Sequence, residues 1–126
     1  MTEFTVHLSN RPGQFAALAD KLSTAGVHIE ALALFSHGDD SMARLMANDV
    51  AIARRVLTDA GVRFEEQRVI ETVIKDEPHA LARMTKKLAD SGINIEAMYL
   101  LHANGDSLHF AVAVDDHELA APHLSR

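Results

Sequence analysis

The residues best suited to chemistry form a short polar loop, Asn10-Arg11-Pro12-Gly13, directly before a helical pattern. A helix that begins at Pro12 presents unpaired N–H groups and a positive dipole end, which favours a carboxylate such as that of a free amino acid. Gly13 lets a ligand approach the backbone, and Asn10 can hydrogen-bond an ammonium or a carboxylate group. The alternative is structural: Pro12-Gly13 marks a turn, and Asn10 caps the helix.

This loop occurs twice in the chain. Asp76-Glu77-Pro78-His79 lies 66 residues after the first loop, and Gly92-Ile93-Asn94-Ile95-Glu96 lies 66 residues after Gly26-Val27-His28-Ile29-Glu30. Without any gap, 13 of the 40 residues between Asn10 and Asp49 are identical to their mates. Unrelated sequences would match at roughly 2–3 such positions. The chain is therefore an internal duplication of one module.

Composition excludes several classes of function. The net charge of −6 argues against a nucleic-acid partner, because binding to phosphates needs a basic surface. The absence of cysteine excludes disulfides, thiolate nucleophiles and zinc–thiolate sites. No apolar run approaches the roughly 20 residues of a membrane span, and Met1-Thr2-Glu3-Phe4 lacks the basic start of a signal peptide. We therefore expect a cytoplasmic protein without a nucleic-acid or membrane partner.

The spacing of apolar residues predicts a βαββαβ order for a first unit, residues 1–68. The expected strands cover residues 3–8, 27–35, 42–47 and 63–67. The expected helices run from Pro12, in the first turn, to the Gly26 stop signal, and from an Asp49 cap to Ala60. His28 begins the second strand, and we expect it near the same end of the sheet as the polar loop.

A second unit, residues 69–126, repeats this order but ends early. Pro122 is expected to interrupt its second helix, and no residues that could form a fourth strand follow in the sequence. Either the second sheet has an open edge, or a strand of another chain fills that edge.

A hairpin of the second unit should turn at Asn104-Gly105, because both residues tolerate positive φ. With that two-residue loop, one face is expected to form the core under the helices. It carries Tyr99, Leu101, Leu108, Phe110, Val112 and Val114. The opposite face is apolar enough that another unit or subunit is expected to cover it. It carries Met98, Leu100, Ala111 and Ala113.

Eight histidines raise the question of a metal site. With the predicted turn, His102 and His109 lie diagonally on one sheet face, while His117 and His123 lie near the end of the sequence. Zinc normally needs three or four converging ligands, and no HExxH pattern or carboxylate-rich loop joins these residues. We expect solvated histidines, with no metal and no cofactor.

Three charged residues need separate interpretation. Glu30 and Glu96 match across the repeat, which indicates a structural role at a strand start, because an acid–base pair needs a cleft and unequal environments. Arg44 has Phe110, an expected core residue, as its mate. Because a buried arginine needs a partner, Arg44 either clamps a carboxylate in the first unit or pairs with Glu30. The alternative is that the first hairpin has a different register or a bulge, so that Arg44 reaches solvent.

The element order and the loop together resemble the ACT domain, a small ferredoxin-like module that senses amino acids in metabolic enzymes. Asn10-Arg11-Pro12-Gly13 and Val27-His28-Ile29 look like its strand-one/helix-one loop and the start of its second strand. The regulatory domain of phosphoglycerate dehydrogenase carries a similar Asn-Arg-Pro-Gly and a Gly-Val-Asn-Ile. The resemblance covers nearly the whole chain. It implies an α+β fold of two ferredoxin-like units with antiparallel sheets side by side and helices packed on one face.

The resemblance also implies a binding site. In ligand-binding members, two domains lie side by side through their second strands, and an asparagine from each holds the amino acid at the junction. Carried over here, Asn10 faces Asn94 at one site, and Asp76 faces His28 at the other. Because Asp76 and His28 replace asparagines and His79 replaces a glycine, Asn10/Asn94 is the better candidate. The expected ligand-binding residues are Asn10, Arg11, Pro12, Gly13, His28, Ile29, Asp76, Asn94 and Ile95.

These observations predict a non-catalytic, amino-acid-binding regulatory protein. Its expected partners are a free amino acid, a second copy in a homodimer, and a metabolic enzyme. The main alternative is an interaction module that pairs with an enzyme or with another ACT domain and needs no small ligand. A third hypothesis is a small enzyme that uses the histidines.

Overall fold

The computed structural model describes residues 1–124, which form two compact units. Residues 2–67 form the first unit. Met1 groups with the residues from Arg68 onward, which form the second unit. The backbone N–H of Val69 donates to the carbonyl of Met1 at 2.9 Å, and this bond ties Met1 to the second unit.

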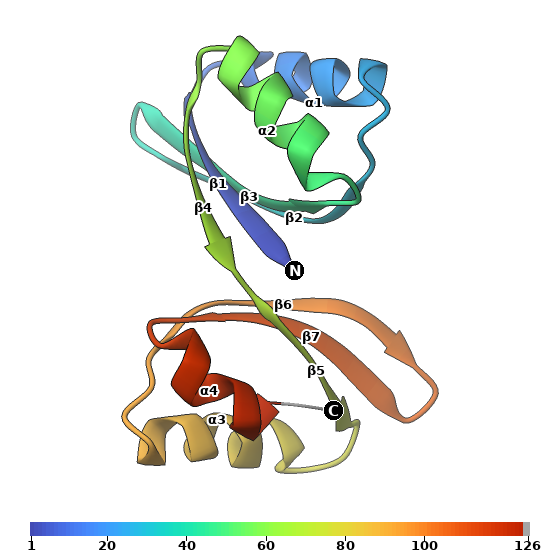
Figure 1. Cartoon of the computed structure of the whole chain (residues 1–126), viewed down its shortest axis with the longest axis vertical. Helices are drawn as coiled ribbons and strands as arrows, with labels where there is room; N and C mark the ends of the chain where they lie inside the picture. The colour runs from blue at the N-terminus through green and yellow to red at the C-terminus, as the bar shows by residue number, and fades with distance from the viewer. Residues whose placement is uncertain (125–126) are drawn as a thin grey trace. The chain divides into compact units, whose positions relative to one another are not determined.

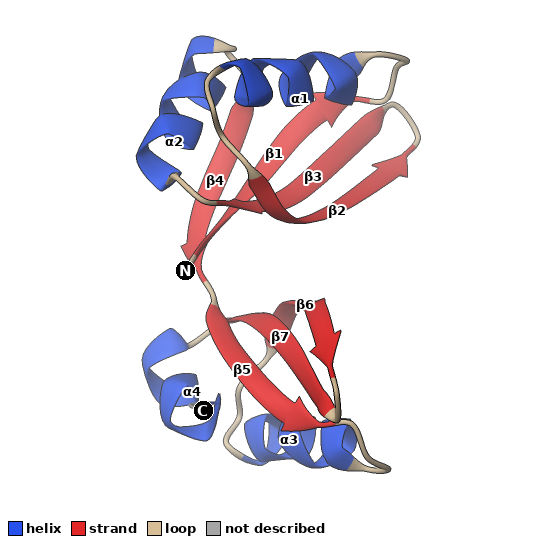
Figure 2. Ribbon diagram, turned by 90° about the vertical axis from the view of Figure 1, so that its right-hand side faces the viewer, coloured by secondary structure: helices blue, strands red, loops and turns tan. Residues whose placement is uncertain are grey.

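The first unit has the βαββαβ order that the sequence predicts (Figure 1). Its elements are β1 (Thr2–Ser9), α1 (Gln14–Thr24), β2 (Ile29–His37), β3 (Asp40–Ala47), α2 (Val50–Asp59) and β4 (Arg63–Arg68). The four strands form one sheet in the order β2-β3-β1-β4, and both helices cover one face of it (Figure 2). β2 starts two residues later than expected, at Ile29.

The core of the first unit lies between the sheet and its two helices. Phe4 of β1 pairs with Leu45 of β3, and both side chains point toward the helices because alternate residues of a strand share a face. The helices add the buried residues Leu18, Leu22, Ala53 and Leu57. Asp49 caps α2 by accepting a hydrogen bond from the N–H of Ile52 at 3.0 Å, which confirms the predicted cap.

The second unit repeats this plan as far as its second helix. Its elements are β5 (Ile70–Lys75), α3 (Ala80–Asp90), β6 (Ile95–Asn104), β7 (Ser107–Val114) and α4 (His117–Leu124). The sheet has the order β5-β7-β6, and α3 and α4 lie on one face of it (Figure 2). Within the described residues this sheet has three strands, with β5 at one edge, so the predicted shorter unit is confirmed.

One extra residue distinguishes the hairpin of the second unit from that of the first. β2 and β3 keep a regular register from Ala31 to His37. The pairing of β6 with β7 instead skips Leu101, which forms a β-bulge between Leu100 and His102. Equivalent residues of the two units are therefore 66 apart up to Leu100 and 67 apart after it.

The gap-free alignment is consequently wrong beyond the bulge. Arg44 corresponds to Ala111 and not to the core residue Phe110. The capping residue Asp49 corresponds to Asp116, which accepts a hydrogen bond from a first-turn N–H of α4 at 3.0 Å. The sequence repeat is real, but one insertion shifts its second half.

The faces of the second hairpin also differ from the prediction. Its loop is Gly105-Asp106, one residue later than expected. Tyr99, expected in the core, pairs with Ala111 on the opposite face, and Met98 packs against the core instead. The four residues expected to share the outer face are therefore divided between the two faces. These residues are Met98, Leu100, Ala111 and Ala113. The reason is that a one-residue change of register moves a side chain to the other side of a sheet.

α4 continues through Pro122, which sequence reasoning expected to interrupt it. Ala120 and Leu124 are buried, and they are the counterparts of Ala53 and Leu57 in α2. The proline removes one backbone hydrogen bond, but core residues on both sides of it hold the helix against the sheet. Packing therefore overrides the local signal of the proline.

Candidate ligand-binding site

The loop after β1 makes Asn10 an anchored hydrogen-bond acceptor. Its side-chain Nδ2 donates to the carbonyl of Gly38 at 2.8 Å, and its backbone N–H donates to the carbonyl of Asp39 at 2.8 Å. Both partners lie in the turn between β2 and β3. Because one N–H of Nδ2 is used in this way and no bond to Oδ1 is present among the described residues, Oδ1 is the acceptor that Asn10 can present to a ligand. Its side chain does not cap α1, so the structural alternative is wrong for this residue.

The first turn of α1 supplies unpaired donors beside this loop. Gly13 is the N-cap, with a φ of 85°, a left-handed value that glycine adopts without strain. α1 therefore begins at Gln14, and Pro12 lies in the turn before the helix. The prediction that Pro12 lies in the first helical turn is wrong. Within the described residues, the backbone N–H groups of Phe15 and Ala16 have no acceptor. With the positive end of the helix dipole, these two N–H groups can bind an anion.

A cavity of about 160 Å³ lies at this point, and we call it the loop cavity. The loop, the first turn of α1 and the ends of β2 and β3 enclose it, and its lining includes Asn10, Arg11, Gly13, Ala16, Leu34 and Ser41. Arg11 is exposed and makes no ion pair with any residue from 1 to 124. The cavity thus combines donors for a carboxylate with apolar carbons, which suits a small amphipathic ligand.

The corresponding loop of the second unit is less suited to a carboxylate. His79 takes the place of the glycine and keeps a left-handed φ of 68°. The backbone N–H of Asp76 donates to the carbonyl of Asp106 at 2.6 Å, but the side chain of Asp76 is a carboxylate instead of an amide. Glu77 adds a second carboxylate, which pairs with Arg83 at 2.9 Å. The carboxylate of Asp76 disfavours a ligand carboxylate at this loop.

His28 and Asn94 stand directly before β2 and β6, and their backbones are held alike. The N–H of His28 donates to Oδ1 of Asn48, and the N–H of Asn94 donates to Oδ1 of Asp115, both at 2.9 Å. Both side chains are exposed, and neither has a polar partner among residues 1–124. These two side chains are therefore available to a ligand.

The isoleucines that follow them face the other way. Ile29 and Ile95 are half-buried and pack against the cores of their units. Any contact that they make with a ligand therefore involves the backbone at the strand start, because the side chains contribute to the core.

Asn10 and His28 lie at opposite ends of the first sheet, contrary to the prediction that they lie near the same end. β1 and β2 both run antiparallel to β3, so they are parallel to each other. Asn10 follows the end of β1, whereas His28 precedes the start of β2, a 9-residue strand. At about 3.3 Å per residue, such a strand spans roughly 30 Å. One unit alone does not bring these two side chains together.

Glu30 and Glu96 interrupt the register at the starts of β2 and β6. The pairing with β3 skips Glu30, and the pairing with β7 skips Glu96, so each forms a β-bulge. A bulge bends the strand and increases its local twist. The matching bulges give the two glutamates a structural place at the strand start, as the sequence indicated.

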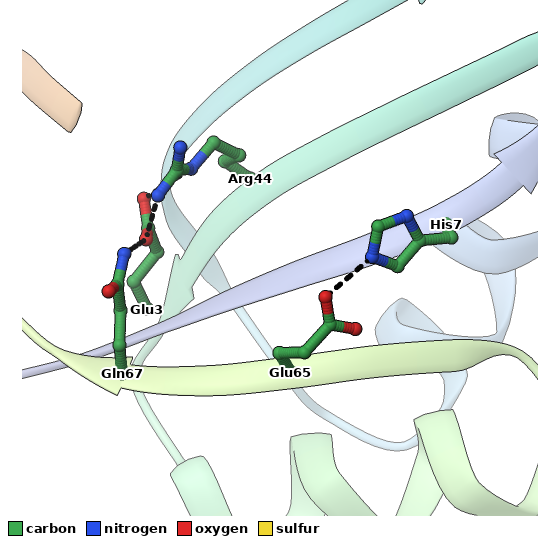
Figure 3. Close-up of polar contacts among 5 residues, drawn as sticks. All are labelled: Glu3, His7, Arg44, Glu65 and Gln67. Atoms are coloured by element: carbon green, nitrogen blue, oxygen red, sulfur yellow. Dashed lines mark hydrogen bonds and ion pairs between the residues drawn. The ribbon is translucent and has the colours of Figure 1, made fainter. Parts of the chain in front are cut away.

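Arg44 is part of a polar network on the face of the first sheet opposite the helices. Its Nε and one terminal nitrogen donate to the two carboxylate oxygens of Glu3, at 3.0 and 2.8 Å. Nε2 of Gln67 donates to the same carboxylate at 2.7 Å (Figure 3). Arg44 thus clamps a carboxylate of its own unit, and that carboxylate is Glu3 and not Glu30. The first hairpin is regular at Arg44, so the predicted alternative of a changed register or a bulge there is wrong. The bulge within the paired strands is instead in the second hairpin, at Leu101.

The histidines do not assemble a metal centre in the described part of the chain. His102 and His109 face each other directly, instead of diagonally, with ring centroids 4.0 Å apart and planes inclined by 20°. Across residues 1–124, no three His, Cys, Asp or Glu side chains are grouped so that they could hold a metal ion. No helix in that range is long and apolar enough to cross a membrane.

No family model and no curated protein matches the chain. Solved structures share its fold. Protein BT0572 from Bacteroides thetaiotaomicron matches with a TM-score of 0.87 and 20% identity, over 97% of this chain and 84% of that one. The ligand-free regulatory subunit of aspartate kinase from Thermus thermophilus matches with a TM-score of 0.68 and 17% identity, over 98% and 87%. A structure of aspartokinase alpha and beta subunits matches with a TM-score of 0.67 and 14% identity, over 97% of this chain and 88% of that one. At these identities the likeness is one of fold, and it covers nearly the whole chain.

Proposed function

We propose that this chain, a tandem pair of ACT-type units by its fold, is a non-catalytic regulatory protein that binds a free amino acid. The observation that carries the proposal is the loop cavity. There the anchored Asn10 presents Oδ1, while Phe15 and Ala16 present unpaired N–H groups. An α-amino acid has a carboxylate for the N–H groups and an ammonium for the amide oxygen.

The second contact that we propose is Asn94, from the other unit or from a second copy of the chain. The support is that Asn10 lies about a strand length from His28 in its own unit, so a site with both loop and strand-start residues needs two units. Asn94 offers an exposed amide with a fixed backbone. We propose a weaker role for the Asp76/His28 pair, because the carboxylate of Asp76 repels a ligand carboxylate.

The similar structures support a regulatory function. One of them is named as the regulatory subunit of aspartate kinase, and another contains the alpha and beta subunits of an aspartokinase. By analogy, we propose that a metabolic enzyme in the cytoplasm is the partner and that bound amino acid changes this association.

The first experiment is a thermal-shift screen of the purified chain against the twenty amino acids. Stabilisation by several degrees with one amino acid supports the proposal, because a ligand that binds only the native state raises its stability. No shift with any amino acid contradicts it.

Calorimetric titration of variants then tests the assigned residues. Asn10→Ala should weaken binding by roughly 10- to 150-fold, the effect of losing one hydrogen bond to a charged group. Asn94→Ala should have an effect of the same order, and His28→Ala should have a smaller one. Circular dichroism confirms that each variant folds. An Asn10→Ala chain that is folded and has unchanged affinity excludes the assignment.

A second function is supported by the exposed edge of the first sheet. β2 is an edge strand, and the exposed fractions of Leu32 and Leu34 are 43% and 46%. An edge strand with exposed apolar side chains can pair with another strand. If the amino-acid screen is negative and the chain binds an enzyme or another ACT domain, it is an interaction module without a small ligand.

A further inference from the structure

The face of the first sheet opposite its helices carries a second and larger cavity. Its volume is about 640 Å³, which is within the range of small-molecule sites, roughly 300–1,000 Å³. A row of side chains crosses it from strand to strand: Arg63 of β4, His7 of β1, Met42 of β3 and Phe35 of β2. We call this the outer cavity. All of its lining residues belong to the first unit.

His7 bridges Glu65 and Arg63 through its two ring nitrogens. Its Nε2 lies 2.7 Å from a carboxylate oxygen of Glu65, which can only accept, so Nε2 carries the proton and donates (Figure 3). Its Nδ1 lies 3.2 Å from a terminal nitrogen of Arg63, which can only donate, so Nδ1 accepts. Both ring nitrogens of His7 are therefore occupied, one by Glu65 and one by Arg63.

Arg63 supplies a positively charged guanidinium to the outer cavity. No carboxylate among the described residues forms an ion pair with it, and the nearby Glu65 is engaged by His7. A guanidinium has five N–H donors in a planar fork, and the contact with His7 uses one of them. The remaining donors suit a carboxylate, which such a fork binds through two parallel hydrogen bonds.

The other side of the outer cavity is apolar. Phe35 exposes 58% of its surface although it is an aromatic residue, and Met42 lies beside it across the strand pair. An aromatic face and a thioether favour an aromatic or bulky apolar group. Arg63 and Phe35 are three strand spacings apart, or about 14 Å between backbones, and their side chains extend into the space between.

Asp40 limits the charge that the cavity accepts. It lines the same cavity one row further along, opposite Ser9 of β1 and His37 of β2. A ligand with a second negative charge would meet this carboxylate, and the repulsion would oppose binding.

We propose that the outer cavity binds a small monocarboxylate with an aromatic or bulky apolar body. The Arg63 guanidinium binds the carboxylate, Phe35 and Met42 contact the apolar body, and Asp40 rejects dicarboxylates. This site is distinct from the loop cavity, although Leu8, Ser9, Ser36 and Ser41 line both.

The test is a titration of the full ¹⁵N-labelled chain with 3-phenylpropanoate, followed by amide chemical shifts. The expected result is saturable shifts at His7, Phe35 and Met42 at millimolar ligand, with smaller changes at Asn10 and Ala16. Two matched probes check the chemistry. Benzylmalonate adds one carboxylate, and 3-phenylpropanol removes the charge; each should bind at least about tenfold more weakly.

Variants connect the shifts to named side chains. Arg63→Ala should weaken binding at least about tenfold, and Arg63→Lys, which keeps the charge, should weaken it less. The control is Arg55→Ala, an exposed arginine of the same unit on α2, which should bind like the parent. Equal binding by a folded Arg63→Ala chain, shifts confined to the Asn10 loop, or no saturable shift would each overturn the proposal.

Discussion

Gly13 and His79 occupy the same place, directly before the first turn of α1 and of α3, and both have a left-handed backbone, with φ values of 85° and 68°. The place therefore demands this conformation in both units. Glycine adopts it freely, whereas a residue with a Cβ is strained there by roughly 1–2 kcal/mol. A Cβ added at Gly13 would have no atom within 4 Å, so the strain is in the backbone and not in packing.

We expect His79→Gly to stabilise the second unit by about 1 kcal/mol, because the backbone strain is relieved and the added freedom of the unfolded chain offsets part of the gain. Urea unfolding followed by signals of the second unit measures this. The matched variant His79→Ala keeps a Cβ and should give no such gain. A loss of stability in His79→Gly would show that the imidazole contributes more than the backbone costs.

Arg44 and Glu3 should contribute strongly to the stability of the first unit. The Glu3 carboxylate is fully buried, so Arg44→Ala leaves a buried charge without its bidentate partner and should cost about 3 kcal/mol. Arg68→Ala is the control, because the pair Arg68–Glu118 is exposed and should change stability by at most about 0.5 kcal/mol. Equal losses in the two variants, measured by chemical denaturation, would contradict this prediction.

The bulge at Leu101 makes Leu124 the counterpart of Leu57. Both are fully buried, so Leu57→Ala and Leu124→Ala should each destabilise their own unit by roughly 2–5 kcal/mol. Leu119→Ala is the control in α4, because Leu119 is 47% exposed and should cost less than about 1 kcal/mol. If Leu119→Ala and Leu124→Ala cost the same, the assigned packing of α4 is wrong.

We expect the chain to form a homodimer at micromolar concentration. The second hairpin does not present the single apolar face that the sequence analysis expected a partner to cover. The edge strand β2 of the first unit, however, exposes Leu32, Leu34 and Phe35, and such an edge favours association. Light scattering should return twice the chain mass for the parent and less for Leu32→Lys, which places a charge at that edge. A monomer mass for the parent would count against the prediction.

The pair Arg54–Glu66 gives a pH-dependent contribution between α2 and β4. Hydrogen bonds from Arg54, at 2.6 and 2.8 Å, lower the pKa of the Glu66 carboxyl. Partial burial of the carboxyl raises this pKa, and the attraction to the charge of Arg54 lowers it further. A lowered pKa in the folded state stabilises the protein above the ordinary glutamate pKa, and the stabilisation is lost as pH falls through the folded value.

Arg54→Ala should therefore lower the melting temperature at neutral pH, and the difference from the parent should shrink in acid. Melting curves at neutral pH and near pH 3 measure this, with Arg55→Ala as the control. A difference that is the same at both pH values would mean that the pair does not act through its charge.

Much of the fold follows from local patterns. The alternation of Phe4, Val6 and Leu8 and the helical spacing of Leu18 and Leu22 predict the first strand and helix, because strand and helix periods depend only on neighbours along the chain. The cap at Asp49 is predictable for the same reason. The repeat of the polar loop, together with the helix and strand that follow it, is enough to predict two units.

The sequence could not place partners that are distant along the chain. The anchoring of Asn10 by Gly38, the clamp of Arg44 on Glu3 and the row from Arg63 to Phe35 all require the pairing of strands to be known. The outer cavity was not predicted from the sequence. Arg63 and Phe35 are far apart in the sequence, and no pattern connects them until the strand order β2-β3-β1-β4 is known.

By itself, then, the sequence determined that one βαββα plan is used twice, because hydrophobic period and turn residues encode elements locally. The tertiary structure alone decided the register. The bulge at Leu101 changes which residues of the second hairpin face the helices, and the parallel course of β1 and β2 separates Asn10 from His28. Register depends on the summed pairing and packing of whole strands, and a single inserted residue moves every later side chain to the other face.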